Sequence, residues 1–130
     1  MLHKRIKKEE GQSLVEFALL LPVVLLIMCA VIDFGWLFAH QLVLSNAVRD
    51  GARLGITCVD EASFSSKVTQ RVRNETGICE QSALRVNARV SGDDVVVEAD
   101  YDLRMLTPMA SLIVGGMEHC VSSTCTMRAE

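Results

Sequence analysis

Aromatic residues, histidine and excess positive charge are all scarce in this 130-residue chain. Phe, Trp and Tyr make up 5% of the residues, and the formal net charge is −3. Proteins that bind nucleic acid usually carry a basic face, often with aromatic side chains on which bases stack. Because the chain has no basic stripe and few aromatics, we predict that nucleic acid is not a partner.

Groups for catalysis are equally few. The three histidines, His3, His40 and His119, lie in distant parts of the chain, so no nucleophile–base pair is evident. Cys120 and Cys125 have four residues between them, which is neither the redox C-x-x-C spacing nor a usual zinc spacing. We therefore predict that the protein is not an enzyme and that it holds no cofactor and no metal.

One long apolar run is present near the start of the chain. No residue from Phe17 to Ile32 is charged, and a basic leader precedes the run with Lys4, Arg5, Lys7 and Lys8. Such a run is about as long as a bilayer requires, and basic flanks stay in the cytoplasm. No Ala-x-Ala site follows it cleanly, which favours a retained anchor over a cleaved secretory signal. We expect one pass through the inner (cytoplasmic) membrane, with the rest exported to the periplasm or cell surface.

The pattern of the remaining residues predicts an α+β protein in three parts. Residues 1–11 form the leader, residues 12–55 a long transmembrane and amphipathic helix, and residues 56–130 a small exported head. We expect Pro22 to kink the long helix or leave a carbonyl unpaired, Asp33 to lie near the outer membrane boundary, and Gly55 to begin the break after the helix.

In the head, apolar spacing predicts one short helix and about three antiparallel strands. Ser63 is a candidate cap for a helix in which Phe64, Val68 and Val72 share a face. Alternation predicts a hairpin, with residues 84–90 and 95–103 joined by a turn at 92–94 and with Arg85 and Arg89 facing carboxylates across the strands. Residues 105–114 are expected to form a further short helix with Pro108 in its first turn, and residues 118–127 a last strand.

Four of the five cysteines lie in the exported part, where disulfides are permitted. Cys120 and Cys125 would face opposite sides of one strand, about 16 Å apart, so a bridge between them is disfavoured. Cys58 and Cys79 flank the short helix and are our candidate pair, which leaves the partners of Cys120 and Cys125 open. A zinc site built from these four cysteines is the weaker alternative.

Glu16 is the residue that most requires an explanation. It stands at the head of the apolar run, five residues after Gly11, and Phe17 follows it at once. A carboxylate near a helix start is favoured by the helix dipole, and this is the simple interpretation. The ordered combination of basic leader, glycine, glutamate and apolar run is more specific, because a charge at a membrane edge is costly.

That combination resembles the class III signal of type IV pilins and pseudopilins, in which a peptidase cuts after the glycine. The core Val15-Glu16-Phe17-Ala18, followed by an apolar run containing Pro22, is similar to TadE-like minor pilins of tight-adherence (Flp-type) pili. Three further elements fit the same pattern: Asp33-Phe34-Gly35, Arg49-Asp50-Gly51-Ala52-Arg53 and Thr126–Glu130. The four exported cysteines depart from it.

The resemblance implies a minor pilin or pseudopilin, cut between Gly11 and Gln12 by a prepilin peptidase. Glu16 would then pair with the new amine of a neighbouring subunit, with Phe17 beside it in the assembly helix. The implied partners are the prepilin peptidase, other pilins or pseudopilins, the pilus assembly platform and the membrane. Two alternatives remain: an uncleaved membrane-anchored binding or sensor domain outside any filament, and a membrane-tethered thiol enzyme.

Overall fold

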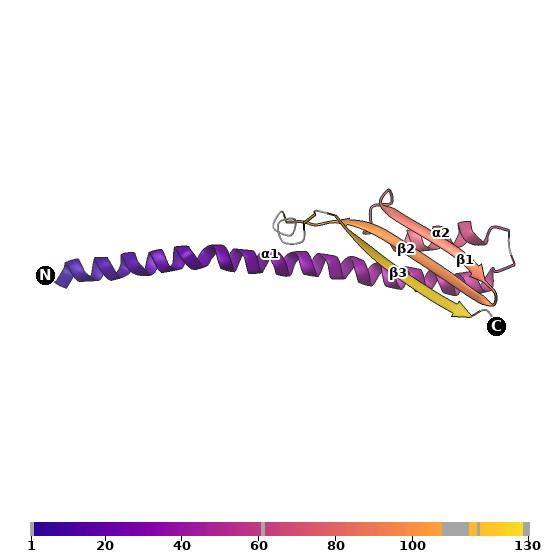
Figure 1. Cartoon of the computed structure of the whole chain (residues 1–130), viewed down its shortest axis with the longest axis horizontal. Helices are drawn as coiled ribbons and strands as arrows, with labels where there is room; N and C mark the ends of the chain where they lie inside the picture. Colours follow the sequence, from indigo (N-terminus) through magenta and orange to yellow (C-terminus); the bar gives the residue numbers. More distant parts are fainter. Residues whose placement is uncertain (1, 61, 108–114, 117, 129–130) are drawn as a thin grey trace.

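The computed structural model describes residues 2–60, 62–107, 115–116 and 118–128, with side chains from Gly11 onward. The elements follow in the order α1 (Leu2–Thr57), α2 (Phe64–Glu75), β1 (Leu84–Ser91), β2 (Asp94–Arg104) and β3 (Glu118–Arg128). Figure 1 shows α1 as a long rod whose C-terminal part lies along the sheet, while its N-terminal part projects alone. The predicted α+β class is confirmed.

The helix α1 is longer at both ends than the sequence predicted. It begins at Leu2 rather than residue 12, because the leader is rich in Lys and Glu, which are good helix formers, and Gly11 alone costs only about 1 kcal/mol. It runs on through Pro22, whose missing N–H leaves the carbonyl four residues earlier without its usual donor. Membrane helices tolerate this loss.

The end of α1 corrects the expected break at Gly55. The helix continues to Thr57, whose hydroxyl donates to the Leu54 carbonyl at 2.7 Å. Gly55 lies inside the helix for a packing reason. A Cβ built on it would meet Val95 Cγ1 at 2.8 Å and Phe64 Cε2 at 3.2 Å. Glycine is therefore used here for close approach rather than for a turn.

The helix α2 forms as its apolar spacing predicted. Phe64, Val68 and Val72 are buried on one face. Ser63 occupies the N-cap position, although its side chain makes no capping hydrogen bond. At the other end, the buried Thr76 donates its backbone N–H and its hydroxyl to the Val72 carbonyl, at 3.1 and 2.9 Å.

The three strands form one antiparallel sheet in the order β1-β2-β3. The hairpin is confirmed: Ser91 pairs with Asp94, and Gly92 takes a φ of +64° in the turn between them. Antiparallel pairing of Asp94 with Arg128 then sets the register of β3, which ends one residue later than predicted. Of the expected helix at residues 105–114, residues 105–107 are not helical and residues 108–114 lie outside the described residues.

The core lies between the inner face of the sheet and the two helices. Alternate β2 residues, from Val95 to Leu103, are buried against α1 and α2. Gly51 permits this approach as well, because a Cβ on it would lie 2.6 Å from Val72 Cγ2. Arg85 and Arg89 meet carboxylates across the strands as predicted, and their partners on the outer face are Asp102 at 2.5 Å and Glu98 at 2.7 Å.

Candidate functional site

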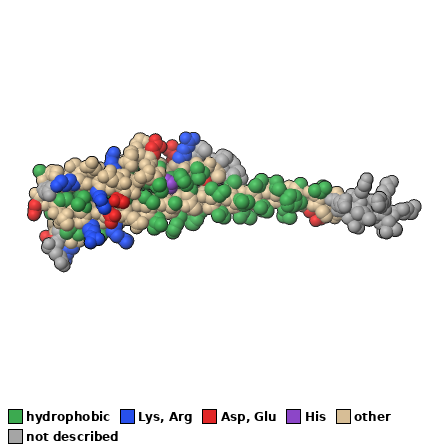
Figure 2. Space-filling view, turned by 180° about the vertical axis from the view of Figure 1, so that it is seen from behind, with side chains coloured by type: hydrophobic (Ala, Val, Ile, Leu, Met, Phe, Trp, Pro, Cys, Tyr) green, Lys and Arg blue, Asp and Glu red, His purple; other side chains and the backbone are tan. Residues whose placement is uncertain are grey.

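The N-terminal part of α1, residues 11–39, forms an exposed apolar rod that we call the stalk. Its large side chains are open to the surroundings: Leu19 is 72% exposed, Phe34 68% and Phe17 63%. Figure 2 shows this continuous apolar surface running away from the head. Exposing an apolar surface of this extent to water is unfavourable. The helix is also long and apolar enough to cross a membrane. The stalk is therefore a single-pass membrane anchor.

The predicted processing and assembly residues lie together at the start of the stalk. Gly11, Gln12, Glu16 and Phe17 are all exposed, and nothing lies within 4 Å of the Cβ position of Gly11. Helical spacing brings Gln12 onto the face of Glu16, and its side-chain amide donates to Glu16 Oε1 at 3.5 Å. That contact is long and exposed, so it does little to satisfy the Glu16 carboxylate. The side chains of Lys4, Arg5, Lys7 and Lys8 in the leader lie outside the described residues.

Asp33, the second carboxylate of the stalk, has a partner from the head. It is only 6% exposed, and the Thr107 backbone N–H donates to its Oδ1 at 3.0 Å. The Thr107 hydroxyl donates to Oδ2. The segment after β2 is thus fastened to α1 by a carboxylate that would otherwise be costly at a membrane boundary.

A second set of contacts joins the stalk to the head about two turns further along. His40 is 1% exposed and lies between Trp36, with ring centroids 4.5 Å apart, and Tyr101, at 5.6 Å. Its Nδ1 is 3.0 Å from the Trp36 carbonyl oxygen, so Nδ1 carries the proton, because a carbonyl only accepts. Tyr101 in turn accepts the Glu80 N–H at 3.2 Å.

Gln41 completes this junction on the side of β3, where its amide donates to the Ser122 carbonyl at 3.2 Å. None of these contacts between stalk and head is evident from the sequence, apart from the expected position of Asp33 near the membrane boundary. The sequence carries one signal for these contacts: each involves a polar residue within or next to an apolar helix, namely Asp33, His40 and Gln41.

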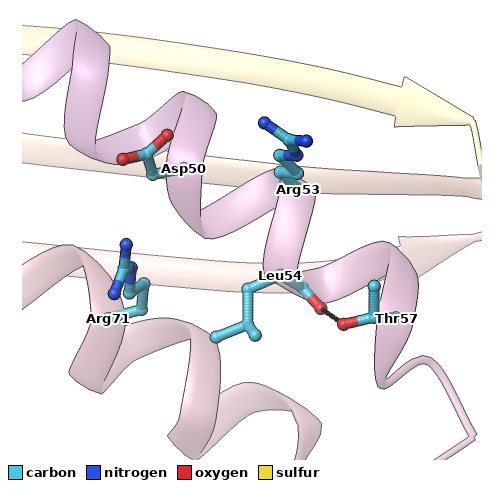
Figure 3. A pocket seen from close by; sticks show the side chains of 5 residues that line it. All are labelled: Asp50, Arg53, Leu54, Thr57 and Arg71. Atoms are coloured by element: carbon cyan, nitrogen blue, oxygen red, sulfur yellow. Dashed lines mark hydrogen bonds between the residues drawn. The ribbon is translucent and has the colours of Figure 1, made fainter.

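At the far end of α1 the two helices enclose a charged hollow of about 630 Å³. Figure 3 shows its five lining residues, Asp50, Arg53, Leu54 and Thr57 from α1 and Arg71 from α2, in front of the strands. Helical spacing explains the arrangement, because the glycine face of α1 turns towards α2 and the sheet while these charged positions turn away. The hollow therefore opens on the face of the head away from the sheet.

All five cysteines are free thiols in the structure. The Cys58 thiol donates to the Leu54 carbonyl at 3.2 Å, and both Cys58 and Cys79 are buried. Formation of a Cys58–Cys79 bridge on oxidation stays a prediction.

The other two cysteines of the head lie on β3, where Cys120 is exposed and Cys125 half-buried. Partial desolvation raises the pKa of the Cys120 thiol, and the neighbouring carboxylates of Asp100 and Asp102 raise it further. Burial likewise raises the pKa of Cys79. A raised thiol pKa lowers the thiolate fraction and with it the nucleophilicity.

The described residues contain no cluster of three or more His, Cys, Asp or Glu side chains suited to a metal. His40 is enclosed in the junction, and the Nε2 of His119 on β3 is buried without a hydrogen-bond partner among the described residues.

In a comparison with known families, residues 11–53 match the family model described as TadE-like protein. The matched segment runs from Gly11 through the stalk to Arg53 in the charged hollow, and it confirms the resemblance seen in the sequence. The match covers about a third of the chain, and this part is similar to TadE-like proteins. Comparisons with curated proteins and with solved structures gave no match.

Proposed function

We propose that this chain is a structural pilin-like subunit that is cut between Gly11 and Gln12 by a prepilin peptidase and then assembles with other pilins. The leader would stay in the cytoplasm and the head would face the periplasm or cell surface. The match to the TadE-like family from residue 11 onward supports this assignment. In this proposal the protein is not an enzyme, and its role is to pack against neighbouring subunits.

The observation that carries the proposal is the exposed carboxylate of Glu16 near the N-terminal end of the stalk. Cleavage after Gly11 would create a cationic amine on Gln12, one helical turn from Glu16. In an assembly of parallel stalks, this amine is the nearest cation that a neighbour could offer to Glu16. Pairing offsets the cost of taking both charges out of water, and removal of one partner leaves the other buried at a cost of about 3–5 kcal/mol.

Phe17 would contribute beside this pair by packing rather than by charge. It is 63% exposed in the single chain, so a neighbouring stalk can cover it. Burying a phenylalanine side chain is worth about 1.5–3 kcal/mol. The assembly platform and the membrane would hold the subunits parallel while these contacts form.

The test is co-expression of the full chain with its cognate prepilin peptidase, followed by intact mass measurement. We expect the mass of a chain beginning at Gln12, and Gly11→Ala should leave the leader attached. Glu16→Gln should be cut normally yet fail to enter assemblies. Glu10→Gln is the matched control, because that residue leaves with the leader and assembly should be normal. An intact leader on the unaltered chain would refute processing, and normal assembly of Glu16→Gln would refute the role of the carboxylate.

A further inference from the structure

The charged groups around the hollow between α1 and α2 are not paired with one another. Asp50 and Arg53 are exposed on α1, and neither has an ion-pair partner among the described residues. Arg71 on α2 contacts Glu75 at 3.2 Å, but this pair is about half exposed and therefore weak. The hollow thus presents two guanidinium groups and one carboxylate, with Arg71 on α2 beside Asp50 and with Arg53 further along α1 (Figure 3).

The β1–β2 turn has the opposite charge pattern. Asp93 follows Gly92 at the tip and is 77% exposed, and Asp94 begins β2 beside it. Arg128, which pairs with Asp94 in the strand register, lies 3.9 Å from the Asp93 carboxylate, with its side chain 73% exposed. The tip therefore presents two carboxylates with one guanidinium next to them.

Both features lie at the same end of the head but on different faces. The turn lies at the end of the sheet, level with the end of α1, whereas the hollow lies between the two helices (Figures 1 and 3). A single chain does not bring the two together. Parallel copies with adjacent heads can do so, with the sheet side of one head facing the helix side of the next.

We propose that the hollow of one copy receives the β1–β2 turn of a second copy. Arg53 and Arg71 bind the carboxylates of Asp93 and Asp94, and Asp50 accepts the Arg128 guanidinium. Each of the three charges on one side then meets a charge of opposite sign on the other. This inference rests on the proposed function, because it needs parallel subunits held by their stalks.

The contact is heterologous, since it joins two different surfaces of the same chain. Contacts of this kind do not close on themselves as a two-fold dimer does, and they extend into rings or open helical assemblies. The stalks supply apolar packing, and the head contact fixes the order and orientation of neighbours. Charge complementarity contributes more to such specificity than to affinity.

The test uses the full chain, co-expressed as two copies with different tags in membranes and solubilised in detergent. One tag is captured and the amount of the other tag recovered with it is measured. This recovery reports self-association. Arg53→Glu in both copies should reduce recovery roughly two- to five-fold, as expected for one exposed ion pair, and Asp93→Lys in both copies should do the same. Arg104→Glu, the same charge change at an exposed position on β2, should leave recovery unchanged.

The decisive sample mixes an Arg53→Glu copy with an Asp93→Lys copy. Each contact between unlike copies is then either the native pair or the reversed pair, so recovery should return towards that of the unaltered protein. Recovery unchanged by Arg53→Glu would overturn the proposal. Loss that the mixture does not restore would also overturn it, because the hollow would then serve another partner.

Intact mass and a Glu16→Gln sample, read from the same preparations, separate this proposal from the proposed function. If Glu16→Gln abolishes assembly while Arg53→Glu has no effect, the head contact is refuted and the stalk role stands. If the leader is uncut while the mixed copies restore recovery, processing is refuted and the head contact stands.

Discussion

Substitution of Gly51 by alanine tests whether close packing of α2 on α1 determines the stability of the head. The added Cβ would lie 2.6 Å from Val72 Cγ2, well inside van der Waals contact. Val72 is fully buried between the helices and the sheet, so it has little room to move. Overpacking of this kind costs about 1–3 kcal/mol, and the higher helix propensity of alanine returns about 1 kcal/mol. The net loss should be up to about 2 kcal/mol.

Gly35→Ala is the matched control, because Gly35 lies in the same helix with nothing within 4 Å of its Cβ position. It should gain only the propensity term, so the two variants should differ by about 1–3 kcal/mol. For a domain of this size, 1 kcal/mol shifts the melting temperature by about 4–8 °C. Thermal unfolding of the full chain in detergent, followed by near-UV circular dichroism of Trp36 and Tyr101, measures the difference.

A third variant isolates the cause. Val72→Ala removes the methyl groups that the new Cβ meets, so Gly51→Ala should cost less in that background than in the unaltered chain. If Gly51→Ala raised the melting temperature as much as Gly35→Ala does, the contact geometry at Gly51 would be wrong.

Two further predictions concern the stalk–head junction and the thiols. Asp33→Asn should destabilise the head by about 1.5–3 kcal/mol in the same thermal assay. The charged Asp33 carboxylate accepts one hydrogen bond on each oxygen from Thr107, whereas the asparagine amide is neutral and has only one acceptor oxygen. An unchanged melting temperature would contradict this. In alkylation of the folded protein, Cys120 should react first and the buried Cys58 and Cys79 only after unfolding; because burial raises the pKa of Cys79, its reaction should also need a higher pH. In the unfolded protein, the number of alkylated cysteines should be the same with and without reductant. Two more alkylated cysteines with reductant would instead support the predicted disulfide bridge.

The elements that the sequence predicted correctly are those fixed by local spacing. The buried face of α2 and the alternation of the hairpin depend on residues a few positions apart, and each repeats with the period of its element. The expected helix break at Gly55 was wrong because local spacing does not determine the role of a glycine. A glycine in a turn and a glycine in a helix crossing have the same local sequence, and only the approach of Val95 and Phe64 distinguishes them.

The junction depends on contacts that no local pattern encodes. Asp33 and Thr107 are separated by 74 positions, and Gln41 and Ser122 by 81. Their pairing follows from how the sheet lies along α1, which is known only once the fold is assembled. The Cys58–Cys79 pairing stays a prediction for the same reason, because sequence spacing alone does not fix the distance between two thiols that flank a helix.

The two carboxylates of the stalk acquire different roles when their surroundings are compared. From the sequence, each is a costly charge in an apolar helix. Asp33 is buried and receives two hydrogen bonds from the head, so the chain itself stabilises this charge. Glu16 is exposed and receives only a long contact from Gln12, in a part of the helix that the head does not reach. A charge that the fold leaves unsatisfied at the edge of an apolar segment is costly unless another molecule stabilises it. In the proposed function that molecule is an adjacent copy, whose Gln12 amine would have the required sign.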